Sequence, residues 1–230
     1  MELTDKVVVV TGAGGAFARE IVLGLLARGA RVAAVDHREQ NLADTAARAD
    51  ADAALSTHLA GLSDRTALES LPESVLAAHG AVDALLHVGG SIHPAAPLAE
   101  LSVDEIEQVI ANNLLGAVYL NKAFLPHLQG RPEAALVNFS HAGALRPIAG
   151  QGGYTTSKGG VRTWSETLAD ELADSTVTVT TVFPGEIGPE PATSPKEAAR
   201  LTIEALVAGP RRAFIGADAE AVASELALLA

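Results

Sequence analysis

Short apolar runs alternate with longer segments of helical periodicity along the whole chain, and this alternation limits the available folds. Parallel strands need a long crossover between them, usually a helix, so repeated strand–helix units predict a parallel sheet. We therefore expect an α/β fold: a doubly wound parallel sheet of about seven strands with helices on both faces, in three layers. The expected strands are Lys6–Thr11, Arg31–Asp36, Ala53–Leu59, Ala84–Val88, Ala134–Phe139, Val177–Val182 and Ala213–Ile215.

The helical patterns fall between these strands. The fourth is long, and we expect it to kink near Gly116. The 230 residues suit one domain, so a single unit over 1–230 is predicted. The proline-rich segment Pro184–Pro191 is expected to form a loop. The expected helices are Ala16–Arg28, Asn41–Asp50, Asp64–Ala78, Val103–Leu128, Tyr154–Leu172 and Pro195–Val207.

The composition argues against several classes of partner and site. The 16 basic and 28 acidic residues give a net charge of −12, which opposes binding to nucleic acid or to an anionic membrane surface. Because the chain has no cysteine, it can form neither a disulfide nor a thiolate nucleophile. The beginning of the sequence resembles no signal peptide, and no long apolar span follows, so a cytoplasmic protein is expected. The histidines at 37, 58, 79 and 127 lack metal-ligand spacing; we expect them at the surface and predict no metal.

A glycine-rich segment, Thr11–Arg19, follows the first strand and opens a helix. Free N–H groups and the helix dipole at such a point can bind a pyrophosphate. Asp36 ends the second strand, where a carboxylate can accept hydrogen bonds from an adenosine ribose and repel a 2′-phosphate. This spacing favours NAD over NADP. The alternative interpretation is a simple glycine turn with a surface acid.

Tyr154 and Lys158 lie one turn apart on the same face of an expected helix. A free tyrosine has a pKa of about 10 and is a poor base at neutral pH. A nearby ammonium favours the phenolate, which lets the tyrosine exchange a proton with an alcohol or carbonyl. The pair alone is weak evidence; it gains weight from the nucleotide loop upstream.

Taken together, these motifs resemble the short-chain dehydrogenase/reductase (SDR) family over essentially the whole chain. Asn112-Asn113, the strand Leu136–Ser140 and Phe183-Pro184-Gly185 add to the resemblance. It implies a Rossmann-like fold and NAD-dependent interconversion of a secondary alcohol and a ketone. In the family the tyrosine is the general acid/base, the lysine binds the nicotinamide ribose and lowers the tyrosine pKa, and an asparagine positions a relay water. These roles would fall on Tyr154, Lys158 and Asn113.

The resemblance also implies where the cofactor and a second subunit bind. The helices Val103–Leu128 and Tyr154–Leu172 would form the interface of a homodimer or homotetramer. The remaining partner would be a small alcohol or ketone, with NAD as cofactor and NADP less favoured. The implied cofactor-binding residues are Gly12, Gly14, Gly15, Ala16, Phe17, Asp36, Leu62, Gly89, Tyr154, Lys158, Pro184, Gly185 and Ile187.

Several positions depart from the family pattern. The second and third glycines of the loop fall on Ala16 and Ala18, and the family's Asn-Asn-Ala-Gly segment appears as residues 87–90, His-Val-Gly-Gly. The acid that meets the adenine is replaced by Gly61, and a nicotinamide-binding threonine by Pro189. These departures leave two alternatives to redox catalysis: a cofactor-impaired binding or regulatory subunit, and a non-redox proton-transfer enzyme.

The position of the family's active-site serine falls on His141, with Ser140 one residue away. The segment from Gly143 to Tyr154 aligns without a gap, which favours His141. A histidine there can donate a hydrogen bond to a substrate oxygen. A one-residue bulge would instead place the Ser140 hydroxyl in the site, and a third alternative is that neither residue takes part. The chain after Gly185 is also short for a substrate lid, so we expect an open site or one completed by another subunit.

Overall fold

Seven parallel strands form one sheet in the order β3-β2-β1-β4-β5-β6-β7. The computed structural model describes residues 1–50 and 53–227. The chain winds outward in one direction from β1 and in the other direction from β4, which is the order of a doubly wound sheet. The predicted fold class is confirmed. The strands are β1 (Val7–Thr11), β2 (Arg31–Asp36), β3 (Leu55–Leu59), β4 (Ala84–His87), β5 (Ala134–Phe139), β6 (Val177–Pro184) and β7 (Arg212–Ile215).

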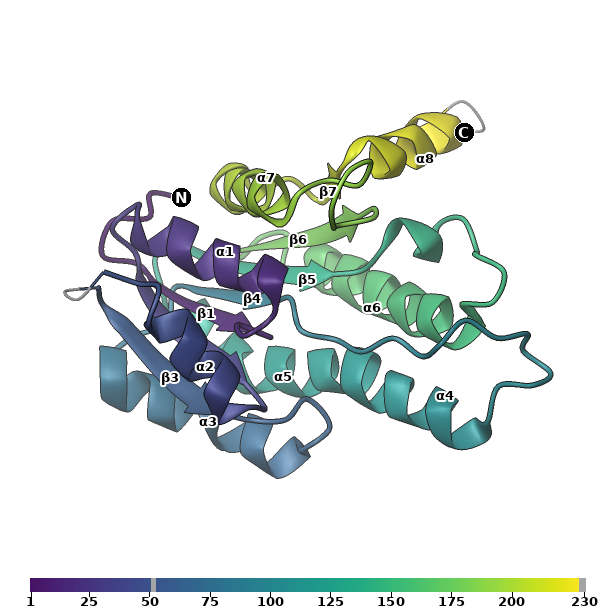
Figure 1. Cartoon of the computed structure of the whole chain (residues 1–230). Helices are drawn as coiled ribbons and strands as arrows, with labels where there is room; N and C mark the ends of the chain where they lie inside the picture. The colour runs from purple at the N-terminus through teal and green to yellow at the C-terminus, as the bar shows by residue number, and fades with distance from the viewer. Residues whose placement is uncertain (51–52, 228–230) are drawn as a thin grey trace.

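Helices cover both faces of the sheet (Figure 1). Alternate side chains of a strand point to opposite faces, so Val8 and Val10 of β1 enter one apolar cluster and Val7 and Val9 enter the other. The first cluster includes side chains of α1 (Ala16–Leu26), α2 (Glu39–Ala46) and α7 (Pro195–Ala208). The second includes side chains of α3 (Arg65–His79), α5 (Gly116–Gln129) and α6 (Gly152–Glu171).

The long fourth helix is interrupted where a kink near Gly116 is expected. It consists of α4 (Val103–Ile110), a π-helical turn over Ala111–Leu115, and α5. A π-helical turn widens the helix and breaks its regular hydrogen-bond ladder. Gly116 lies against the next layer: a Cβ there would lie 2.8 Å from the backbone oxygen of Leu62.

A C-terminal helix, α8 (Ala217–Ala227), has no counterpart among the predicted elements. Its sequence is a run of alanines and acids without a clear apolar stripe, which explains why periodicity missed it. It follows β7 and packs beside η2, the short 3₁₀ turn at Ala142–Ala144 after β5, as Figure 1 shows. Within residues 1–50 and 53–227, the helices are too short or too polar to cross a membrane.

Candidate active site

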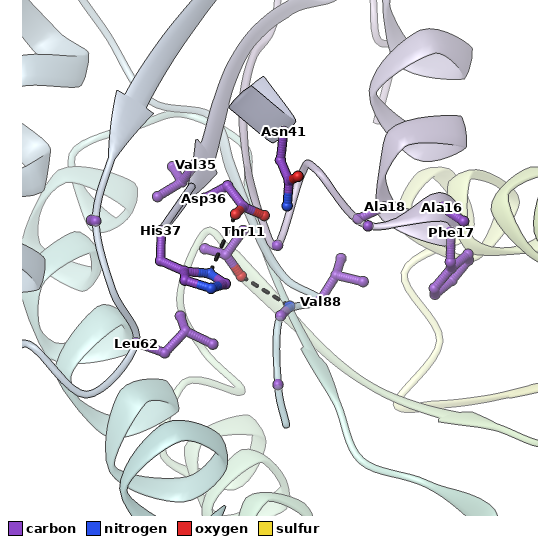
Figure 2. Close-up of a pocket in the computed structure, with 15 residues that line it drawn as sticks. Thr11, Ala16, Phe17, Ala18, Val35, Asp36, His37, Asn41, Leu62 and Val88 are labelled. Atoms are coloured by element: carbon purple, nitrogen blue, oxygen red, sulfur yellow. Dashed lines mark hydrogen bonds and ion pairs between the residues drawn. The ribbon is translucent and has the colours of Figure 1, made fainter. Parts of the chain in front are cut away.

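The carboxyl ends of β1 and β4 meet at the point where the sheet reverses its winding, and a cavity of about 350 Å³ opens there (Figure 2). In open α/β sheets this crevice is where ligands bind. Gly12 and Gly89 let the two loops touch, since a Cβ on Gly12 would lie 2.7 Å from the Cα of Gly89, and Gly12 has a φ of +68°. The lining residues are Thr11, Gly12, Gly15, Ala16, Phe17, Ala18, Val35, Asp36, His37, Asn41, Ala60, Leu62, Val88, Gly89 and Gly90.

The amino end of α1 faces this cavity with its backbone exposed. Gly15 is the N-cap and supplies no side-chain acceptor, and the first turn contains no acid. The N–H groups of the first turn are therefore available to an anion. Arg19 holds the loop in place, because its guanidinium donates to the Gly14 carbonyl (2.8 Å) and to the Thr45 hydroxyl (3.0 Å). Sequence reasoning missed this support, which depends on α2 packing beside the loop.

Asp36 lies at the cavity, as its position at the end of β2 predicts. Its side chain is buried and accepts hydrogen bonds from the backbone N–H groups of Gly14 and Arg38, both at 3.0 Å. His37 Nδ1 lies 3.3 Å from the same carboxylate, a pairing drawn in Figure 2. The carboxylate thus fixes the loop and presents a negative charge beside the cavity.

His87 is buried beneath the glycine loop. Thr11 Oγ1 accepts a hydrogen bond from the Gly89 N–H at 3.2 Å and lies within hydrogen-bond distance, 3.0 Å, of His87 Nδ1. The other ring nitrogen, Nε2, has no hydrogen-bond partner among the described residues. Burial lowers the pKa of His87 to about 3, the Lys158 ammonium adds to this shift, and the Asn113 backbone opposes it. The ring is therefore neutral at physiological pH.

This buried imidazole predicts acid-sensitive stability. A histidine whose folded pKa lies below its unfolded value binds more protons in the unfolded chain, so stability falls as the pH drops below the unfolded pKa of about 6.5. Between about pH 7 and pH 5 we expect His87 to cost the wild type about 2 kcal/mol of unfolding free energy. Urea denaturation of wild type and a His87→Asn variant at both pH values measures the difference. If the unfolding free energies of the two proteins change equally between these pH values, His87 is not the buried neutral histidine that lowers stability in acid.

Tyr154 and Lys158 lie on the first turns of α6 and face the same region. The Lys158 ammonium lies 5.9 Å from the centre of the Tyr154 ring and donates a hydrogen bond to the Phe139 carbonyl at 2.9 Å. Burial raises the pKa of Tyr154 to about 12 and lowers that of Lys158 to about 8. The direction for Tyr154 is opposite to that expected from a neighbouring ammonium, because desolvation dominates in the protein without ligand.

Asn113 lies in the π-helical turn, and its amide is held on both sides. The side-chain NH₂ donates to the Ser91 carbonyl and to the Ser157 hydroxyl, both at 2.9 Å, and the side-chain oxygen accepts from the Ser91 N–H at 2.7 Å. These bonds join the loop after β4 to helix α6, three residues beyond Tyr154. The side chain is fully engaged, and the residue fixes the relative position of these two segments.

The structure separates the two candidates for the serine position. The Ser140 hydroxyl is buried and donates to the backbone carbonyl of Lys158 at 2.8 Å. The His141 ring instead packs edge-on against Tyr154, with ring centres 5.4 Å apart. Its Nδ1 accepts from the Gly143 N–H at 2.9 Å, so the neutral ring carries its proton on Nε2. Burial lowers the pKa of His141, the Lys158 ammonium does so to a smaller extent, and Asp218 opposes the shift.

His93, from the loop after β4, accepts a backbone N–H in the first turn of α6, whose N-cap residue is Gln151. Its Nδ1 donates to the Pro94 carbonyl at 2.7 Å, which leaves Nε2 to accept the Tyr154 backbone N–H at 3.2 Å. No local sequence signal marks such a contact, because the histidine comes from a distant loop.

The surface position expected for His79 is wrong: its side chain is buried in α3, and its Nε2 lies 2.7 Å from the Ser56 hydroxyl. The long aliphatic face of α3 carries it inward.

Pro184, expected to begin a loop, is instead the last residue of β6, and the loop begins at Gly185. The loop is closed by hydrogen bonds between Gly188 and Thr193 and between Thr193 and Glu186. Gly185 is tightly packed, since a Cβ there would overlap the carboxylate of Asp218 in α8. Asp218 also accepts the Glu186 N–H at 2.8 Å. The C-terminal helix is therefore attached to the segment whose residues Pro184, Gly185 and Ile187 are predicted to meet the cofactor.

Most of the predicted site residues fall into two neighbouring groups, while Pro184, Gly185 and Ile187 lie at the end of β6 and in the loop that follows it. Gly12, Gly15, Ala16, Phe17, Asp36, Leu62 and Gly89 line the cavity at the switch point. Gly14 does not line it but packs against Asn41, which sequence reasoning did not single out. The second group surrounds Tyr154 and comprises Asn113, Ser140, His141 and Lys158.

Comparisons with known proteins agree with this architecture. The short chain dehydrogenase family model matches residues 6–199. The chain is 33% identical over 185 residues to "Probable oxidoreductase EphD" of Mycobacterium tuberculosis, covering 80% of this chain but only 31% of that protein's length. It is 31% identical over 188 residues to the 2-(R)-hydroxypropyl-CoM dehydrogenase of Xanthobacter autotrophicus, covering 80% of this chain and 75% of the relative. It is 30% identical over 195 residues to the 2,3-dihydroxy-2,3-dihydro-p-cumate dehydrogenase of Pseudomonas putida, and the match covers 83% of this chain and 74% of the relative.

Solved structures show the same fold. A short-chain dehydrogenase from Streptomyces avermitilis superimposes with a TM-score of 0.87 at 26% identity, covering 98% of this chain and 94% of that one. A short chain dehydrogenase/reductase from Burkholderia phymatum, in complex with NAD, gives a TM-score of 0.85 at 22% identity, and the match covers 93% of this chain and 90% of that one. The sheet order, the family match and these similarities agree, and the chain belongs to the short-chain dehydrogenase family.

Proposed function

We propose that this chain is an NAD-dependent oxidoreductase that interconverts a secondary alcohol and a ketone, with Tyr154 as the general acid/base. The observation that carries the proposal is the grouping of Tyr154, Lys158 and His141 beside a switch-point cavity whose helix N-terminus is uncapped. Family membership supports it, and two relatives are named as dehydrogenases of hydroxylated compounds.

The residues at the switch point suit the adenosine and pyrophosphate end of a dinucleotide. The uncapped first turn of α1 would bind the pyrophosphate, and Gly12 and Gly89 let the two loops beside it pack closely together. Asp36 would accept hydrogen bonds from the adenosine ribose and repel a 2′-phosphate. Ala16 adds a methyl group at the cavity wall, so we expect a pyrophosphate placed slightly outward. When bound, the nicotinamide supplies or accepts the hydride.

Around Tyr154, each residue has a proposed task. Tyr154 exchanges the proton of the substrate oxygen, and Lys158, whose ammonium is buried, binds the nicotinamide ribose and stabilises the phenolate. Asn113 fixes the loop after β4 against α6. His141 Nε2–H donates to the substrate oxygen in the place of the family's serine, while Ser140 supports the Lys158 backbone.

Cofactor titration tests the proposal directly. By calorimetry we expect NAD to bind and the 2′-phosphorylated form to bind at least about tenfold more weakly, because Asp36 repels the added charge. An Asp36→Asn variant keeps an acceptor for Gly14 and should narrow this difference, whereas Asp44→Asn, at an exposed position on α2, should not. No binding at millimolar NAD would refute the proposal and favour a cofactor-impaired binding subunit. Tighter binding of NADP would refute the role of Asp36.

Self-association through α4, α5 and α6 is a further part of the proposal. Val103 and Leu115 are exposed apolar side chains on the α4–α5 segment, and an interface would remove them from water. Light scattering coupled to size-exclusion chromatography distinguishes a monomer from a dimer or tetramer.

A further inference from the structure

A second cavity, of about 360 Å³, is formed jointly by helix α8 and the chain that follows β5. It is distinct from the cavity at the switch point, because the two cavities share no lining residue. A cavity of this size accommodates a small molecule. It is lined by His141, Ala142, Gly143, Arg146, Ile148, Asp218, Ala221 and Val222.

One stripe of α8 forms a wall of this cavity. Asp218, Ala221 and Val222 are spaced i, i+3 and i+4, so they lie on the same face of the helix and all line the cavity. Glu225 continues the stripe one turn later and pairs with Arg146, at 3.0 and 3.2 Å. The helix is therefore attached to both ends of the site: by Asp218 to the loop after β6, and by Glu225 to the segment after β5.

The cavity adjoins the proposed reaction centre through His141. This residue lines the cavity and packs its ring against Tyr154. A substrate whose oxygen is bound by Tyr154 and His141 would therefore direct a substituent towards α8. This wall comes from α8, which follows β7, and not from the loop after β6.

The charges around the cavity are unequal. Arg146 is neutralised by Glu225, whereas Asp218 accepts only a backbone N–H and pairs with no Lys or Arg among the side chains that the structure describes. The remaining lining is aliphatic or neutral, apart from the polar ring of His141. A carboxylate placed in this cavity would meet an unpaired negative charge, while an uncharged aliphatic group would meet alanine, valine and isoleucine.

From this arrangement we infer that α8 is the substrate lid of this protein, that the cavity takes a short, uncharged aliphatic substituent of the alcohol or ketone, and that Asp218 selects against substrates that carry a carboxylate there. The inference rests on the proposed function for the reaction, but the cavity and its selectivity can be measured by binding alone.

The first test compares levulinate, a methyl ketone that ends in a carboxylate, with its uncharged isostere that ends in an isopropyl group. Saturation-transfer NMR measures binding of each ketone, and NADH consumption measures its kcat/KM. The wild type should prefer the uncharged ketone. Asp218→Asn should raise the affinity and the kcat/KM for levulinate by about five- to tenfold at low ionic strength and change those for the isostere little. The effect is modest because the Asp218 carboxylate is exposed and solvent screens its charge.

Glu220→Gln removes an equal charge outside the cavity stripe and should leave the levulinate-to-isostere ratio of affinity and kcat/KM unchanged. Equal effects of the two variants, or a wild-type preference for levulinate, would overturn the inference.

The second test fills the cavity. Ala221→Phe should reduce binding of the isopropyl ketone at least about tenfold while NAD titration stays at the wild-type value, because the added ring occupies the space between α8 and Ile148. Unchanged ketone binding would refute the lid. If the wild type binds the ketone without turning it over, and Ala221→Phe loses this binding, the result would support the site and refute the proposed reaction. No ketone binding to the wild type would refute the site itself.

Discussion

Replacing Tyr154 with phenylalanine is expected to lower turnover by about 100- to 10,000-fold, the range that positioned acid–base groups supply, while cofactor affinity stays close to the wild-type value. The Tyr154 hydroxyl makes no hydrogen bond to the described residues: its backbone donates to His93 and accepts from Ser157. The variant therefore leaves no buried group unpaired, and the ring keeps its contact with His141. Steady-state kinetics with parallel NAD calorimetry and urea denaturation separates loss of chemistry from loss of fold.

The chain offers a matched control, because it has two tyrosines. Tyr119 lies on α5 beside Arg65, away from the proposed site, so Tyr119→Phe should retain turnover. The Tyr119→Phe background also isolates the titration of Tyr154 by ultraviolet absorbance. Burial predicts a pKa near 12 without cofactor, and the proposed role of Lys158 predicts a lower value once NAD is bound. Undiminished turnover in Tyr154→Phe, or a Tyr154 pKa that does not fall on NAD binding, would contradict the proposal.

The sheet was predictable because its strands are short apolar runs separated by helices, and this alternation leaves few arrangements open. Strand β1 shows why: Val7 to Val10 are all buried, half on each face, and only a central strand covered by helices on both sides needs four consecutive valines. The switch-point cavity follows from the same order, since Gly12 directly follows β1 and Asp36 ends the adjacent strand β2.

Contacts between distant segments were not predictable in this way. His93 binds the first turn of α6 from a loop about sixty residues earlier, and α8 (ADAEAVASELA) offers too few large apolar residues to mark a buried face. The raised pKa of Tyr154 also depends on burial, which the spacing of Tyr154 and Lys158 does not describe. Sequence spacing indicates which residues can meet; tertiary packing determines their environment.

Lys158→Met is expected to abolish most turnover and yet to stabilise the protein. The Lys158 side chain is 5% exposed, its only hydrogen bond to the described residues is to the Phe139 carbonyl, and burial lowers its pKa to about 8. At neutral pH the folded protein therefore contains a buried ammonium whose desolvation is poorly offset. Methionine has a similar length and no charge, so we expect the unfolding free energy at pH 7 to rise by about 1 to 3 kcal/mol. Without the ammonium, Tyr154 loses its stabilising partner and turnover should fall by at least about 100-fold.

The pH dependence of this gain distinguishes an electrostatic cause from better packing. Because the folded pKa of Lys158 is lower than its unfolded value of about 10.4, the unfolded chain binds more protons between these values, and the wild type gains stability as the pH rises through that window. Between about pH 7 and pH 9.5 the gain should be about 2 kcal/mol, and the advantage of Lys158→Met should shrink by the same amount. Lys122→Met, at an exposed position on α5, should change neither turnover nor this slope. If Lys158→Met is less stable than the wild type at pH 7, or if its advantage does not depend on pH, then the buried ammonium is not a cost to the fold, and the lysine is kept for structure as well as for catalysis.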